Sequence, residues 1–185
     1  NLTVTYQQLD GRGLNALGGI SFTIQPGEFV SIVGPSGSGK STLIRVVAGL
    51  VKPASGGVWL DDTLVTTPSP RVALMFQEAN LLTWRTVIDN IALPLELAAV
   101  SKPERTAAAL ALLPRLGLDC PGSYPSELSG GMAQRVALGR VLIQKPDVLL
   151  LDEPFGALDA LTRERLSHDL INVWAQERQT VLMVT

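Results

Sequence analysis

One glycine-rich segment restricts the fold of this chain more than any other feature. The run Gly34-Pro35-Ser36-Gly37-Ser38-Gly39-Lys40-Ser41 matches the pattern G-x-x-x-x-G-K-[ST], and Thr42 follows it. Such a segment binds phosphate when it joins a strand to a helix, because its backbone N–H groups converge on the anion at the positive end of the helix. The flanks fit: residues 28–33 are apolar and β-branched, and residues 41–48 have helical spacing. A Gly/Ser-rich turn could match by chance, but these flanks favour a phosphate-binding loop.

A second segment supplies the acidic groups that such a loop requires. Four apolar residues at 148–151 predict a buried strand, and Asp152, Glu153 and Pro154 follow it. Adjacent side chains at a strand end point in different directions, so Asp152 can face Mg²⁺ while Glu153 faces an attacking water. Lys40 can reach the β- and γ-phosphates, and the Ser41 hydroxyl can bind the same ion. The structural alternative is an ordinary acidic turn.

Alternating strand and helix patterns predict the fold class. We expect an α/β phosphate-loop NTPase core, with a mixed, mainly parallel sheet flanked by helices, and a helical insertion subdomain. The chain would form one domain over 1–185, with its core at 1–77 and 141–185 and the helical part at about 78–140. The predicted strands are 2–6, 20–24, 28–33, 57–60, 72–76, 148–151 and 180–185, with helices at 41–48 and 160–176 and a turn at 10–13. Breaks in the helices of the middle region are predicted at Pro94, at Pro103, at Pro114 and over the segment from Pro121 to Pro125.

Composition excludes several classes of protein. With 185 residues, 46% hydrophobic and 17% charged, the chain has enough apolar material for a core and is not intrinsically disordered. No apolar run approaches the ~18 residues that a membrane span needs. A net charge of −2 gives no general attraction to nucleic acid. Cys120 is the only cysteine, so no internal disulfide can form.

A third motif carries a family resemblance. Leu128-Ser129-Gly130-Gly131-Met132, followed by Gln134-Arg135, lies upstream of Asp152. Together with the loop at 34–41 and the acidic strand end, it resembles the nucleotide-binding subunits of ATP-binding-cassette (ABC) transporters, over essentially the whole chain. The segments at 78–84, 89–90, 128–135 and 153–159 look most like the importer branch that handles nitrate, sulfonate, taurine and bicarbonate.

The resemblance implies roles for further residues. Tyr6 would stack on adenine, although an ordinary strand aromatic is the alternative. Gln77 would contact Mg²⁺ and the attacking water. Ser129, Gly130 and Gly131 would face the γ-phosphate held by a second protomer, and Asp159 would cross the dimer interface. Similar chains usually continue Val-Thr-His-Asp where this one stops at Thr185. We therefore expect a truncated C-terminal end that lacks the histidine contact to the γ-phosphate.

The implied function is an ATP-hydrolysing subunit, with ATP and Mg²⁺ as ligands, that powers uptake of a small anion. Its partners would be a second copy or a related ATPase subunit, transmembrane permease subunits and, indirectly, a solute-binding protein, with no nucleic acid. It would lie on the cytoplasmic face of the cell (inner) membrane. The alternatives are a soluble ABC-type ATPase acting on DNA or ribosomes, and a catalytically silent nucleotide-binding module. Leu81, Leu82 and Trp84 could form a docking groove or pack the insertion onto the core.

Overall fold

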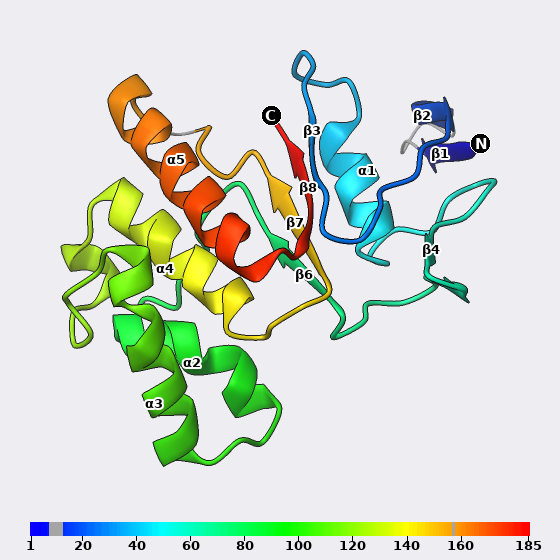
Figure 1. Cartoon of the computed structure of the whole chain (residues 1–185). Helices are drawn as coiled ribbons and strands as arrows, with labels where there is room; N and C mark the ends of the chain where they lie inside the picture. Colours follow the sequence, from blue (N-terminus) through cyan, green and yellow to red (C-terminus); the bar gives the residue numbers. More distant parts are fainter. Residues whose placement is uncertain (8–12, 157) are drawn as a thin grey trace.

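A four-stranded parallel sheet organises the chain (Figure 1). The computed structural model describes residues 1–7, 13–156 and 158–185. The strand order is β3 (Phe29–Ile32), β8 (Thr180–Val184), β7 (Val148–Asp152) and β6 (Val72–Met75). Ile32 and Asp152 both pair with Val184, so β3 and β7 end at the same edge of the sheet. The predicted strands at 28–33, 72–76, 148–151 and 180–185 are confirmed within a residue or two.

Helices cover both faces of this sheet, as Figure 1 shows. On one face, Ile44 of α1 (Lys40–Val47) packs with Leu150 and Leu182 of the two central strands. On the other, Leu149 and Leu151 share a core with α4 (Gly130–Leu142) and α5 (Ala160–Glu177). Strands that are apolar on both sides are typical of parallel sheets buried between helices. The predicted α/β class is therefore confirmed.

The middle of the chain is helical. It contains α2 (Val87–Leu97), α3 (Lys102–Leu112), the 3₁₀ helices η1 (Pro114–Leu116) and η2 (Pro125–Glu127), and α4. Its apolar residues join the same core cluster as the sheet face beneath α4. The packing around α4 is close: a Cβ added to Gly139 would lie 2.6 Å from Leu116 Cδ1. Within the described residues, none of the helices combines the length and the apolar character needed to cross a bilayer.

The expected helix break at Pro94 is wrong, because Pro94 lies inside α2. Proline cannot donate the backbone hydrogen bond that would reach the carbonyl four residues earlier. That carbonyl belongs to Asn90, and it accepts a hydrogen bond from Nε of Arg140 at 3.2 Å instead. A side chain of α4 therefore satisfies the acceptor that Pro94 leaves without its helical partner.

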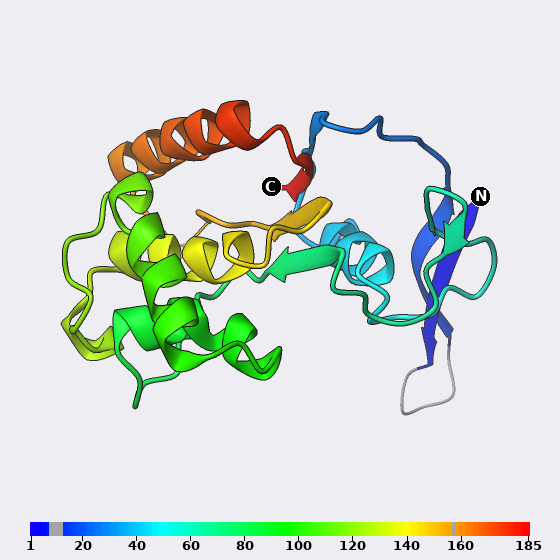
Figure 2. The same cartoon turned by 60° about the horizontal axis from the view of Figure 1, so that its bottom comes forward.

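Two short antiparallel pairs lie beyond α1 (Figure 2). They are β1 (Leu2–Gln7) with β2 (Gly13–Ile20), and β4 (Trp59–Leu60) with β5 (Thr63–Leu64). The predicted strand at 20–24 is wrong, because the strand observed here, β2, ends at Ile20. Leu17 of β2 pairs with Val4 of β1, and both side chains are buried against α1. The predicted turn at 10–13 lies outside the described residues except for Gly13.

Candidate functional site

The glycine-rich loop joins β3 to α1, as its sequence predicts. Gly37 and Gly39 have φ of 80° and 91°, values that favour glycine. Gly39 is the N-cap of α1, and a Cβ there would lie 2.3 Å from the carbonyl oxygen of Ala16. The backbone of β2 therefore packs directly against the loop. Lys40, Ser41 and Thr42 form the first turn of α1, at the positive end of the helix.

Lys40 directs its cation into the loop. The residue is buried, and its Nζ donates to the carbonyl oxygens of Gly34 at 2.7 Å and Pro35 at 3.0 Å. The same Nζ lies 3.6 Å from Oε1 of Glu153. The structure thus brings the predicted phosphate-binding lysine and the predicted general base together.

Ser41 and Asp152 form a second contact between the loop and β7. The Ser41 hydroxyl donates to Oδ1 of Asp152 at 2.8 Å, and Asp152 is only 4% exposed. A hydroxyl and a carboxylate are the hard oxygen ligands that Mg²⁺ prefers, and Mg²⁺ usually needs only one or two protein groups beside phosphate and water. These two side chains therefore fit the expected ion.

Glu153 occupies a strained backbone position at the end of β7. Its φ is 44°, in the left-handed region, and its N–H donates to the carbonyl oxygen of Val184 at 3.0 Å. Such conformations concentrate at functional sites. β8 and Thr185 hold both halves of the site, because Val184 O accepts from Glu153 N, Thr185 N donates to Ile32 O, and Gly34 N donates to Thr185 O.

Gln77 is exposed and follows β6, at the same carboxyl edge of the sheet. Its backbone carbonyl accepts a hydrogen bond from Nε2 of Gln134 at 2.9 Å. Gln134 comes from α4, and the sequence motif alone suggested no position for its side chain. This contact attaches the backbone of a predicted catalytic residue to the helix that follows Ser129.

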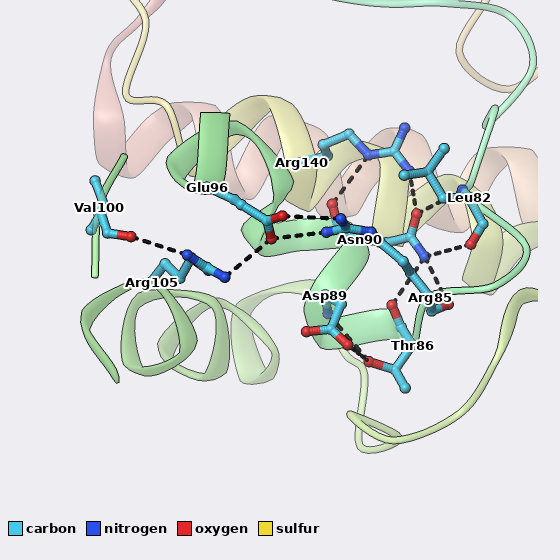
Figure 3. A network of polar contacts seen from close by, with 9 residues as sticks. All are labelled: Leu82, Arg85, Thr86, Asp89, Asn90, Glu96, Val100, Arg105 and Arg140. Atoms are coloured by element: carbon cyan, nitrogen blue, oxygen red, sulfur yellow. Dashed lines mark hydrogen bonds and ion pairs between the residues drawn. The ribbon is translucent and has the colours of Figure 1, made fainter. Parts of the chain in front are cut away.

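Figure 3 shows the polar network that fixes the next segment. Asn90 is fully buried; its Oδ1 accepts from Leu82 N and from Arg140 Nη2, and its Nδ2 donates to the carbonyl oxygens of Leu82, Arg85 and Thr86. Arg140 also donates to the Asn80 carbonyl at 2.9 Å, and burial lowers the pKa of its guanidinium. The roles of Asn90 and Arg140 were not predicted from the sequence. The signal that could have identified Asn90 is an asparagine within an otherwise apolar helix.

The same segment contains Leu81, Leu82 and Trp84, for which a docking groove and packing onto the core were the two alternatives. Leu81 packs against the main core cluster, whereas Trp84 is 72% exposed. The packing interpretation is therefore correct for Leu81, and Trp84 remains available on the surface. Glu96 of α2 pairs with Arg85 and with Arg105 nearby.

Ser129 is the N-cap of α4, and its Oγ accepts from Met132 N at 3.3 Å. Gly130 and Gly131 form the first turn, and Ser129 and Gly130 are exposed. Helix α4, which Ser129 begins, packs on the face of the sheet opposite to α1, the helix that follows the glycine-rich loop (Figure 1).

Asp159 and Tyr6 occupy two further positions. Asp159 caps α5, where Oδ1 accepts from Thr162 N at 3.0 Å; hydrogen bonding to Thr162 lowers the pKa of the Asp159 carboxyl. Tyr6 lies on β1 opposite Leu14 of β2, with both side chains exposed. The hairpin that carries Tyr6 is the one that packs against the phosphate loop through Ala16.

Comparisons with known proteins agree with this geometry. A family model described as ABC transporter matches residues 17–156. The chain is 46% identical over 176 residues to the taurine import ATP-binding protein TauB of Rhizobium johnstonii, covering 95% of this chain and 67% of that protein. It is 44% identical over 173 residues to the nitrate import ATP-binding protein NrtD of Synechococcus elongatus, covering 92% of this chain and 63% of that protein.

A solved structure resembles the whole chain. It is described as a dimeric post-hydrolysis state of the ATP-binding cassette MJ0796 bound to ADP and Pi. The TM-score is 0.87 at 36% identity, over 100% of this chain and 85% of that one. The similarity in fold therefore extends from the β1–β2 hairpin to β8.

Proposed function

This chain belongs to the ABC transporter family, and on that premise we propose that it hydrolyses ATP at the carboxyl edge of its parallel sheet to power import of a small anion. One observation carries the proposal. Lys40 Nζ lies 3.6 Å from Glu153 Oε1, and the neighbouring Ser41 hydroxyl donates to Asp152. The cation that we assign to phosphate binding, the two side chains that we assign to the metal and the carboxylate that we assign as the base thus lie close together.

Each residue has a proposed part in the reaction. The loop at 34–42 would hold the phosphates through its backbone N–H groups, with Lys40 as the point charge. Ser41, Asp152 and Gln77 would hold Mg²⁺, whose positive charge would stabilise the negative charge that develops on the phosphate oxygens. Glu153 would accept the proton of the attacking water, a contribution of ~10²–10⁴-fold in rate. Tyr6 would support the adenine ring.

We propose that two protomers complete each site. Ser129 and Gly130 are exposed, and with Gly131 they stand at the start of a 13-residue helix, where an anion is stabilised. Because α4 and α1 pack on opposite faces of the sheet, we assign a partner's nucleotide as the anion that these residues bind. Asp159 would lie at the same interface. The partner would be a second copy or a related ATPase subunit; one similar structure is described as dimeric.

The transported solute is proposed from the relatives. Proteins named for taurine import and nitrate import are among those most similar to this chain. Both solutes carry an anionic group, so we propose a nitrate-, sulfonate-, taurine- or bicarbonate-like substrate. The subunit would act at the cytoplasmic face of the membrane together with permease subunits. A solute-binding protein would deliver the solute to the permease. Co-purification with a permease would separate this proposal from a soluble ATPase of DNA or ribosomes.

Replacing Glu153 with glutamine tests the proposed reaction. Glu153→Gln removes the base and leaves the loop intact, so ATP affinity is expected to stay within about twofold while phosphate release falls ~10²-fold or more. The variant is also expected to accumulate a dimer with ATP and Mg²⁺. Affinity, phosphate release and sedimentation would be measured in parallel. Near-wild-type hydrolysis would show that Glu153 is not the base.

A further inference from the structure

Helix α4 begins at one part of the proposed site and contacts the backbone of another. Its first turn carries Ser129, and a Cβ on Gly131 would lie 3.0 Å from Thr162 Cγ2, in the first turn of α5. One turn further along, Gln134 donates to the backbone carbonyl of Gln77. The helix therefore lies between the segment that follows Glu153 and the end of β6.

The environment of Gln134 is unusual for an amide side chain. The residue is 5% exposed, and it lines a cavity of about 10 Å³ together with Phe155, Leu138 and Leu166. In the part of the chain that the structure describes, its Oε1 is buried without a hydrogen-bond partner. An apolar side chain of similar length would fill this space without leaving a buried acceptor unsatisfied. Packing alone therefore does not explain a glutamine here.

The other end of α4 is attached to the same segment. Arg140 donates to the carbonyl oxygens of Asn80 and Asn90 and to the Asn90 side chain. With Gln134 at one end and Arg140 at the other, α4 and the segment from Gln77 to Asn90 are joined at two separated points. These bonds would carry a displacement of α4 to the Gln77 peptide.

From these contacts we infer that Gln134 is a positioning residue for ATP hydrolysis. Its amide fixes the Gln77 peptide relative to α4, so that Gln77 reaches its place at the metal and the water when the first turn of α4 engages a partner's nucleotide. Gln134 itself touches neither nucleotide nor metal. The inference rests on the proposed function, because Gln77 and Ser129 take their roles from it.

The test compares the same substitution at two amides of one region. Gln134→Met keeps the length of the side chain and removes its donor. Gln144→Met is the matched control, because Gln144 is exposed just after α4 and, within the described residues, its Nε2 donates to the Arg140 carbonyl at 3.3 Å. The measurements are kcat and KM for ATP, the melting temperature, and hydrogen exchange of the amides at 77–80.

For Gln134→Met we expect kcat to fall ~10-fold with KM within about twofold, since a misplaced catalytic group lowers the rate without weakening the phosphate loop. Exchange at 77–80 is expected to rise ~10-fold with the melting temperature unchanged. Gln144→Met is expected to match the wild type in all four measurements.

Three results would overturn the inference: an unchanged kcat, unchanged exchange at 77–80, or a melting temperature that falls in parallel with kcat. Gln134→Glu, also without the donor, must lower kcat at least as far. A wild-type chain that hydrolyses no ATP would refute the proposed function instead, and the exchange measurement would then decide this inference by itself.

Discussion

Replacing Asn90 with alanine would remove the centre of the network that fixes the segment after Gln77 (Figure 3). The Asn90 side chain is fully buried and makes five hydrogen-bonding contacts: two accepted, from Leu82 N and Arg140, and three in which the two N–H groups of Nδ2, one of them shared, donate to backbone carbonyls. Asn90→Ala deletes all five and leaves the partner groups in place. We expect this substitution to lower the stability of the fold and not to disturb the phosphate loop.

The magnitude follows from the number of bonds and the exposure of their partners. At about 1 kcal/mol net per hydrogen bond, five bonds set an upper value of about 5 kcal/mol. Leu82, Arg85 and Thr86 are only half-buried, so water can replace part of the loss. We therefore expect a decrease of about 2–4 kcal/mol in the free energy of unfolding, or roughly 5–15 °C in melting temperature for a chain of this size.

Urea unfolding followed by tryptophan fluorescence would measure this change. Asn172→Ala is the control, because Asn172 is exposed on α5 and, among the described residues, its side chain hydrogen-bonds to the His168 ring; a change within about 0.5 kcal/mol is expected. Asn90→Asp keeps the oxygen that accepts from Leu82 N and Arg140, but it replaces Nδ2 with a carboxylate oxygen that faces three carbonyl oxygens. This substitution should therefore destabilise the fold at least as much as alanine at neutral pH. A loss below 0.5 kcal/mol for Asn90→Ala, by the ~1 kcal/mol scale of a single bond, would refute the reasoning.

Three further substitutions test other parts of the molecule. Lys40→Ala should weaken ATP binding itself, because it removes the cation in the loop; a titration with unchanged affinity and turnover would contradict the assignment of 34–41. Ser129→Arg should leave ATP binding by the monomer intact and block dimer closure, and sedimentation with a non-hydrolysable analogue would test this: a stable dimer would count against a role in trans. Hydrogen bonding to Arg85 lowers the pKa of Glu96 below its ordinary 4.5, so its contribution to stability is present above that pH and is lost as the pH falls through the lower, folded value. Glu96→Gln should therefore lose less stability than the wild type below pH 4.5 in acid unfolding curves, and identical curves would show that the pair contributes nothing.

Local patterns predicted the parts of the site that depend on neighbours in sequence. The helix begins at Lys40 because the glycine pattern places the anion-binding turn immediately before it. β7 ends at Asp152 because four apolar residues precede two carboxylates. Ser129 caps α4 as its side chain and the following glycines suggest. In each case the residues that decide the structure lie within a few positions of one another.

The features that the sequence could not predict depend on distant partners. Pro94 remains inside a helix because Arg140, fifty positions from Asn90, supplies a donor to the Asn90 carbonyl. The contact between Gln134 and Gln77 spans 57 positions. The strand at Gly13–Ile20 escaped notice because its glycines obscure the alternation, while the alternating residues that follow Ile20 find no strand partner in the described chain.

The strand order also governs when the site can form. β3 carries the phosphate loop and β7 the two carboxylates, yet these strands do not pair with each other: each pairs with β8, which follows both in the sequence. During synthesis from the N-terminus, the lysine and the carboxylates therefore have no common register until residues 180–184 insert between them. Contacts of such large sequence separation slow folding and leave strand edges exposed in the meantime. The two halves of the site therefore come into register only when β8 pairs with both strands, so a ribosome-bound or proteolytically shortened chain without β8 keeps the lysine and the carboxylates apart.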